Sequence, residues 1–127
     1  MASWQVHHLV SAMGYKRTLC FTSSLAATHR LQLLLRHLPG DVRVAECSSR
    51  VDKASRRRLL ADFSAGRVDV LVCTDAVARG MDLGRVDCVL SYDPPKFVKN
   101  YIHRIGRTAR AGRPGTSITL LDPSEVT

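Results

Sequence analysis

The chain has 127 residues, of which 45% are hydrophobic, and this size and composition predict a single domain over residues 1–127. No apolar run approaches the roughly 20 residues that cross a membrane, and the first residues lack the basic and apolar regions of a signal peptide, so no membrane partner is expected. The net charge is +8, and nine of the 19 Lys and Arg residues lie in 50–58 and 104–113, which favours a polyanionic ligand.

The first half of the chain predicts a short helix followed by a strand, a helix and a second strand. Apolar spacing indicates an amphipathic helix over 4–13, a buried strand over 18–22 and a helix over 25–38. Pro39 ends that second helix, and the next strand is expected over 42–47. The residues expected to face the core from the helix over 25–38 are Leu31, Leu34, Leu35 and Leu38.

The second half of the chain continues the alternation of helices and strands. Asp52 is a suitable N-cap for a helix that Gly66 ends. Three more strands are expected, over 68–73, 86–92 and 116–121. Because strands alternate with helices, the sequence predicts an α/β domain with a mostly parallel sheet of at least five strands. In such sheets, function gathers at the carboxyl ends of the strands.

The cysteines indicate the redox compartment. They form no C-x-x-C pair, and each falls within a predicted strand, so we expect buried free thiols rather than zinc ligands or disulfides. This favours a reducing, intracellular compartment. The four residues are Cys20, Cys47, Cys73 and Cys88.

The stretch Tyr101–Arg110 combines an apolar helical stripe with cations. His103 and Arg107 would project from the face opposite the stripe, and Arg110 would lie in the loop that follows. Guanidinium groups fixed at a helix end suit a phosphate-bearing ligand, because they pair bidentately with phosphate oxygens. A solvated basic helix face is the alternative for these arginines taken alone. The stripe consists of Val98, Tyr101, Ile102 and Ile105.

Three strings taken together resemble the second RecA-like domain of superfamily 2 helicases, specifically the DEAD-box RNA helicases. Residues 74–82 resemble motif V of that family, residues 103–110 resemble motif VI, and residues 19–24 resemble motif IV. The resemblance covers residues 5–122. It implies a RecA-like three-layer α/β/α fold, and it implies that the first, ATP-binding RecA-like domain is absent from this chain.

The chain departs from the family pattern in three places. Lys53 stands where the family usually has Gln, the turn Ser48–Arg50 replaces a His-Gly pair, and Ala109 replaces a Gly of motif VI. The first two departures bear on the detail of RNA contact. The turn, together with residues 108–110, resembles a nucleolar subgroup that acts in large ribosomal subunit assembly, which implies pre-ribosomal particles as partners and a nuclear or nucleolar location.

For ATP, the resemblance places Arg107 and Arg110 at the γ-phosphate across an interdomain cleft, with Arg110 as the arginine finger. Such arginines stabilise the charge that develops on the transferred phosphoryl group. Asp82 would accept a hydrogen bond from the ribose. The alternatives are a salt bridge within this domain for the arginines and a helix or turn cap for Asp82.

ATP and Mg²⁺ would be bound mainly by the missing N-terminal lobe. The chain has no G-x-x-x-x-G-K-[ST] phosphate loop and no Asp-Glu-Ala-Asp segment. We therefore expect no metal site here, and no ATP hydrolysis by this chain alone.

For RNA, the expected contacts go to the sugar-phosphate backbone, so they position the strand without reading its sequence. Gly80 would allow close approach of the backbone to a ligand, whereas Arg79 could instead pair with an acid. Asp75, His103 and Arg104 are expected to organise the motifs or bridge to the N-terminal lobe, and a packing role is the alternative for His103. The residues expected near RNA are Thr74, Gly80, Arg56, Arg79, Ser23 and Arg50.

The sequence therefore predicts the C-terminal lobe of an ATP-dependent RNA helicase. A non-catalytic RNA-binding or adaptor module of the same fold is the alternative, and it would not require the intact set of Arg107, Arg110 and Asp82. A DNA-directed superfamily 2 motor is disfavoured, because motif VI there usually begins with Gln rather than with a residue like His103.

Overall fold

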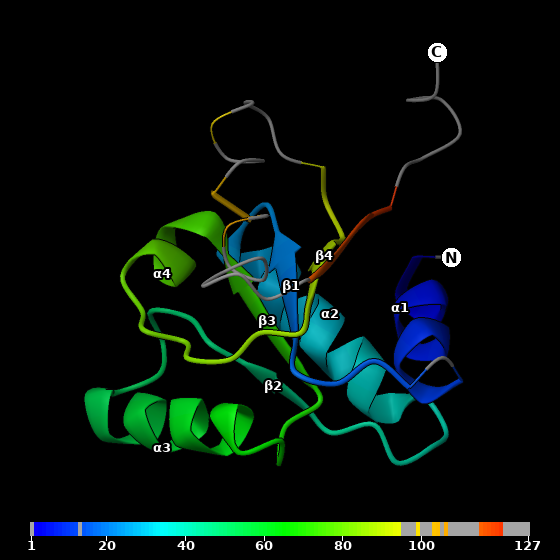
Figure 1. Ribbon diagram of the computed structural model, residues 1–127, viewed down its shortest axis with the longest axis horizontal. Helices are drawn as coiled ribbons and strands as arrows, with labels where there is room; N and C mark the ends of the chain where they lie inside the picture. Colours follow the sequence, from blue (N-terminus) through cyan, green and yellow to red (C-terminus); the bar gives the residue numbers. More distant parts are fainter. Residues whose placement is uncertain are drawn as a thin grey trace.

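A computed structural model gives the fold of the chain (Figure 1). It describes residues 2–12, 14–94, 99, 103–104, 106 and 115–120, with side chains from residue 5 onward. Arg107 and Arg110, which the sequence places at the γ-phosphate, lie outside the described residues.

Five parallel strands form one sheet, in the order β2-β3-β1-β4-β5. The three central strands are buried along nearly their whole length, which suits their Val, Leu, Cys and Thr side chains. The predicted α/β class and parallel sheet are confirmed. The strands are β1 (Thr18–Thr22), β2 (Val44–Glu46), β3 (Val70–Thr74), β4 (Cys88–Ser91) and β5 (Thr116–Thr119).

Three of the helices were expected from the sequence, and one was not. The short helix α4 follows β3 directly, and the Thr74 hydroxyl caps it by accepting a hydrogen bond from the Val77 amide at 3.4 Å. A helix of five residues is too short to produce a periodic apolar pattern, so apolar spacing could not predict it. The helices are α1 (Ala2–Ser11), α2 (Leu25–His37), α3 (Lys53–Ser64) and α4 (Asp75–Arg79).

Two apolar clusters, one on each face of the sheet, give the domain three layers. Leu19 and Phe21 of β1 pack with Phe63 of α3 on one face. Cys20, between them in sequence, packs with Leu31 of α2 on the other face, where α1 also contributes buried side chains. Figure 1 shows the same arrangement, with α1 and α2 on one side of the sheet and α3 on the other. The predicted three-layer RecA-like architecture is therefore observed.

The buried face of α2 differs from the predicted one. Leu31 and Leu35 are buried as expected, but Leu34 is 46% exposed. The helix instead buries Thr28 and Gln32. Thr28 can be buried because its hydroxyl lies 2.6 Å from the hydroxyl of Thr22 in β1, so the core-facing stripe includes a polar residue that apolar spacing alone did not identify.

All four cysteines are free and buried, as the sequence predicts. Burial raises the pKa of the Cys88 thiol to about 11 and also raises the pKa of the Cys20, Cys47 and Cys73 thiols. Among the described residues, no group of His, Cys, Asp or Glu could hold a metal ion, and no helix is long and apolar enough to cross a membrane.

Candidate functional site

The register of the sheet brings several strand ends to one edge. Thr22 of β1 is aligned with Thr74 of β3, and Phe21 is aligned with Ser91 of β4. Because the strands are parallel, the segments that follow them all leave the sheet at its carboxyl edge. This edge therefore collects the candidate residues from motifs that are far apart in the chain.

Arg104 joins three of these segments. Its guanidinium donates to both carboxylate oxygens of Asp75, at 2.8 and 2.7 Å, and to the carbonyl oxygen of Asp93 at 2.8 Å. It also lies over the ring of Phe21, 4.8 Å from the centroid. The residue is only 3% exposed. Its donors are thus engaged inside the domain, and Arg104 fixes where the segment around residues 103–106 leaves the core.

Asp93 is a contributor that the sequence pattern did not single out. Its carboxylate accepts a hydrogen bond from the Ser23 amide at 2.8 Å, and its carbonyl accepts from Arg104. The sequence did contain one indication of this role. Asp93 is an acid directly after a buried strand, and that strand runs parallel to β1. The sequence analysis gave Asp93 no role at the site and predicted only the strand over 86–92 that ends before it.

The segment Thr74–Asp82 leaves a cation and a glycine open to solvent. Thr74 uses its hydroxyl as the cap of α4, and Arg79 at the end of α4 is exposed, with no ion pair among the described residues. Gly80 is also exposed, and a Cβ there would meet nothing closer than the Val77 carbonyl oxygen at 3.8 Å. Its φ of −92° is open to any residue, so nothing in the described fold requires glycine at this position.

Asp82 is exposed just beyond α4 and serves a local turn. One of its carboxylate oxygens accepts a hydrogen bond from the Gly84 amide at 3.4 Å, and Gly84 has a φ of +65°. The turn-cap alternative for Asp82 is therefore present in the structure. The carboxylate remains exposed to solvent, where a hydroxyl donor could reach it.

Arg56 points back onto the turn that precedes its helix. Its guanidinium donates to the Ser48 carbonyl at 3.0 Å and to the Val51 carbonyl at 3.5 Å. Its Nε is buried and has no partner among the described residues. Arg56 thus shapes the turn, while the side chain of Arg50 within that turn is exposed. The thiol of Cys47 donates to the Met81 sulfur at 3.2 Å, which ties the turn to the end of α4.

Ser23 and His103 complete the described candidates. Ser23 is exposed directly after β1, held through its backbone by Asp93. His103 is exposed on a helical turn next to the buried Arg104. Asp93 therefore links Ser23 to Arg104, and Arg104 links onward to Asp75. The contact between Cys47 and Met81 places the turn around Arg50 beside α4.

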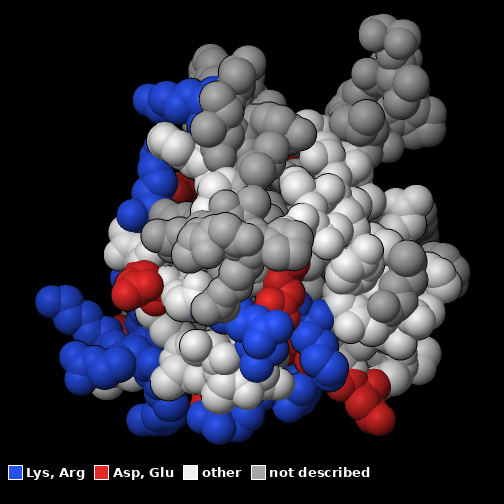
Figure 2. Space-filling model, in the orientation of Figure 1, with Lys and Arg blue, Asp and Glu red and all other residues white. Residues whose placement is uncertain are grey.

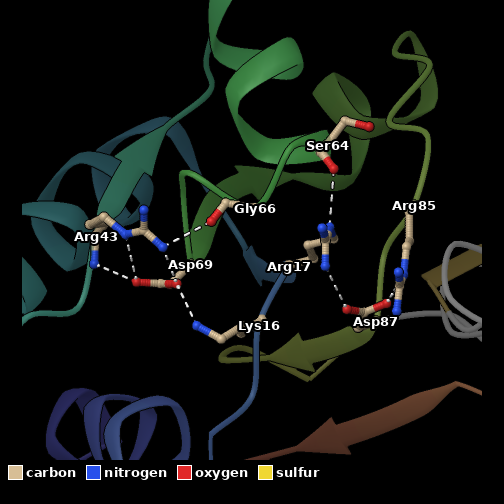
Figure 3. Close-up of polar contacts among 8 residues, drawn as sticks. All are labelled: Lys16, Arg17, Arg43, Ser64, Gly66, Asp69, Arg85 and Asp87. Carbon is tan, nitrogen blue, oxygen red and sulfur yellow. Dashed lines mark hydrogen bonds and ion pairs between the residues drawn. The ribbon is translucent and has the colours of Figure 1, made fainter.

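The cations at the opposite edge of the sheet are engaged in ion pairs, in contrast to several of those near the candidate site. Asp69 accepts from Arg43 at 3.0 Å and lies 4.0 Å from Lys16, and Asp87 pairs with Arg17 at 3.4 Å and Arg85 at 2.7 Å (Figure 3). Figure 2 shows further cations over α3, at the lower left. The exposed cations without an ion pair in the described part of the chain include Arg50, Lys53, Arg57, Arg58 and Arg79.

A parallel five-stranded sheet with helices on both faces, and with its polar segments gathered at the carboxyl edge, is the architecture of a RecA-like domain. Residues 4–112 match the family described as the helicase conserved C-terminal domain, and the chain belongs to this family. The resemblance to the DEAD-box branch is confirmed by the relatives that follow.

The human ATP-dependent RNA helicase DDX51 is 49% identical over 116 residues, which cover 91% of this chain and 17% of that protein. The structure of the Escherichia coli DEAD-box protein SrmB, bound to regulator of ribonuclease activity A, matches with a TM-score of 0.81 and 35% identity, covering 94% of this chain and 69% of that one. Saccharomyces cerevisiae Dbp5 bound to RNA and ADP BeF3 matches with a TM-score of 0.77 and 30% identity, over 94% and 32%. The chain therefore spans less than a fifth of the length of human DDX51.

Proposed function

We propose that this chain is the C-terminal lobe of an ATP-dependent DEAD-box RNA helicase, which closes with an N-terminal lobe over ATP and RNA. One observation carries the proposal. At the carboxyl edge of the sheet, the buried Arg104 is held by Asp75 and Asp93, and it anchors the start of a basic segment whose sequence continues to Arg107 and Arg110. A cation that is to act across a cleft must be anchored, because misplacement by about 1 Å can cost on the order of a hundredfold in rate.

The RNA part of the proposal uses the unpaired cations and the exposed glycine of the same edge. Arg79 and Arg50 are free to meet phosphates, and Gly80 leaves room for a strand to approach the backbone. Arg56 acts by holding the turn that presents Arg50. Ser23 and Thr74 line the ends of the two adjacent central strands. The partner is an RNA strand contacted without regard to base sequence.

The ATP part of the proposal rests on Arg107, Arg110 and Asp82. The two arginines stabilise charge on the γ-phosphate in the transition state, with Arg110 as the arginine finger. The exposed Asp82 carboxylate is suited to accept a hydrogen bond from a ribose hydroxyl. The N-terminal lobe holds the triphosphate and Mg²⁺, so the two lobes share one site and this chain alone does not turn over ATP.

The finer assignment is a nucleolar helicase that acts on pre-ribosomal particles of the large subunit. Its support is the turn Ser48–Arg50 and residues 108–110, which resemble that subgroup. Cross-linking of RNA to the parent protein in cells tests this assignment, and recovery of pre-ribosomal RNA is the expected result.

The proposed function is tested by RNA-stimulated ATP hydrolysis of the full-length parent beside its Arg110→Ala variant. Because an arginine finger is worth roughly 10³- to 10⁵-fold in turnover, we expect turnover to collapse while RNA affinity stays nearly unchanged. Arg113→Ala, which removes another cation of the same segment, is the matched control and should keep its turnover. If Arg110→Ala hydrolyses ATP normally, the non-catalytic RNA-binding or adaptor module becomes the better description.

A further inference from the structure

An apolar groove lies on the outer face of α2, beside the turn that follows β2. Its volume is about 530 Å³, within the range of roughly 300–1,000 Å³ that ligand sites occupy. Leu25 and Leu33 form its apolar part and are 41% and 40% exposed. With Leu34, they are the large hydrophobic side chains that the described surface leaves exposed. The groove is lined by Leu25, Ala26, His29, Arg30, Leu33 and Arg50.

Helical spacing explains why these side chains share one face. The core-facing stripe of α2 contains Thr28, Leu31, Gln32 and Leu35. At helical spacing, Ala26, Arg30 and Leu33 lie opposite that stripe, and Leu25 and His29 lie along one side of it. Ser24 fixes the start of this face, because its hydroxyl caps the helix by accepting from the Ala27 amide at 3.1 Å. His29 contacts Glu46 of β2 at 2.7 Å and thereby ties the helix to the sheet. The groove is thus built on anchored elements, which lowers the entropic cost of occupying it.

The charge at the groove is positive. Arg30 and Arg50 line it, and neither has an ion-pair partner among the described residues. His29 is already engaged with Glu46 at 2.7 Å. Among the described residues, no carboxylate lines the groove. The surface therefore offers an apolar centre and a cationic rim, and it favours an occupant with large apolar side chains flanked by acids.

Two other occupants fit less well. An RNA strand would place its phosphates against cations and stack its bases on aromatic rings, but no aromatic side chain lines this groove and two leucines fill its centre. A second copy of this chain would bring together two molecules of net charge +8.

We propose that this groove docks an acidic amphipathic peptide segment of a partner protein, which inserts apolar side chains against Leu25 and Leu33 and places carboxylates beside Arg30 and Arg50. The assignment goes beyond helicase activity. It describes a surface of α2 that receives a regulator or adaptor next to Ser23 and Arg50 at the carboxyl edge. A segment docked there would lie beside any strand bound at that edge.

The test is selection of peptides of about 16 residues from a random displayed library against this chain, followed by fluorescence anisotropy with the enriched sequences. We expect peptides with acids around a helical pair of large apolar residues. Leu33→Glu should weaken their binding by about tenfold to a hundredfold, because it removes the burial of a leucine and adds a repelling carboxylate. Leu34→Glu, on the same helix but outside the groove, is the matched control and should change affinity by less than about twofold.

A second matched pair separates charge from apolar contact. Arg30→Glu should weaken binding and reduce its dependence on salt, whereas Arg36→Glu, on the same helix but outside the lining, should do neither. Thermal melting establishes that each variant is folded. Enriched peptides that are insensitive to Leu33→Glu, or that carry no acids, would overturn the proposal. So would a single-stranded RNA whose binding Leu33→Glu weakens as much as it weakens peptide binding, or self-association that the same change abolishes.

Discussion

At the scale of single residues, Arg104 shows how a cation can serve a phosphate site without touching the ligand. Its donors are directed to Asp75 and Asp93 at hydrogen-bonding distances of 2.7 to 2.8 Å, inside the domain. Buried ion pairs of this kind contribute little net stability, because removing both charges from water offsets their attraction. What the pair contributes is position, since it joins the start of α4 to the segment that carries motif VI.

Arg104→Met tests this role. We expect a loss of about 3 kcal/mol in the free energy of unfolding, because the change leaves Asp75 without its buried partner. The double variant Asp75→Asn/Arg104→Met should recover part of the loss, since no unpaired charge remains. Urea denaturation of the isolated chain measures both. If the single and double variants lost the same free energy of unfolding, that result would contradict the explanation.

Gly80→Ala separates a structural role of this glycine from a ligand-binding role. An added Cβ meets only ordinary contact at 3.8 Å, and the backbone angles suit alanine, so we expect the free energy of unfolding to be unchanged or slightly raised. RNA affinity of the full-length protein should fall, because the methyl group occupies the space through which a strand approaches. Retained RNA affinity in a titration monitored by fluorescence anisotropy would show that no strand passes close to Gly80.

At the scale of elements, α2 shows the limit of apolar spacing as a guide. Leu31, Leu34 and Leu35 fit a helical stripe in the sequence, but the true stripe passes through Thr28 and Gln32. Hydrogen bonding between Thr28 and Thr22 makes the polar position acceptable in the core, and only the tertiary partner reveals it. Leu33 therefore lines the proposed groove, whereas its neighbour Leu34, which apolar spacing wrongly assigned to the core, is exposed outside it.

The contacts that join the strands at their amino-terminal edge suggest a test with pH. Burial of the Asp69 carboxylate would raise its pKa, but hydrogen bonds from the Arg43 side chain and amide outweigh this and hold the pKa below its usual range. A lowered pKa in the folded state stabilises the fold above the unfolded-state pKa, and this stability is lost as pH falls through the folded-state value.

We therefore expect Asp69→Asn to be less stable than the unchanged chain at neutral pH. The difference in free energy of unfolding should be constant down to about pH 5 and should close as the pH falls below about 4. Urea denaturation at a series of pH values measures it. Asp41→Asn, which changes an exposed acid that has no ion pair among the described residues, is the control and should show a smaller difference. A difference that stays the same at pH 3 would contradict the assignment.

At the scale of the whole molecule, the two edges of the sheet hold their cations differently. Those at the amino-terminal edge, such as Arg85, are matched by carboxylates, whereas Arg79 near the carboxyl edge is not. Only unmatched cations can release counterions from a phosphate backbone without first breaking an ion pair. Among the described residues, unmatched cations such as Arg50 and Arg79 thus lie near the carboxyl edge.

This difference predicts the salt dependence of RNA binding. For single strands, the slope of log affinity against log salt is about −0.7 per phosphate contact. Arg79→Ala should make the slope shallower by about 0.7, whereas Arg85→Ala should leave it unchanged because that guanidinium is paired with Asp87. Anisotropy titrations at several salt concentrations give the slopes. Equal effects of the two substitutions would show that net charge, rather than local contact, governs binding.

The α/β fold class, a sheet of at least five strands and the buried free cysteines could all be predicted from the sequence. Buried strands, and the cysteines within them, leave a local hydrophobic pattern. The family of the domain was equally predictable from motifs V and VI. The contacts of Asp93 and Arg56 were not, since Asp93 depends on an amide brought close by the register of the sheet, and Arg56 depends on how the turn before its own helix folds back. The roles of Arg107 and Arg110 remain predictions, because they lie outside the described residues.

The ion pairs at the amino-terminal edge also bear on how the chain finds its topology. The residues directly before β2, β3, β1 and β4, in their order across the sheet, are Arg43, Asp69, Arg17 and Asp87, so the charge alternates in sign from strand to strand. Exchanging any two neighbours among these strands would place like charges side by side, which is unfavourable. The alternating charges at this edge therefore favour the observed strand order. They make sheets with exchanged strands less favourable during folding.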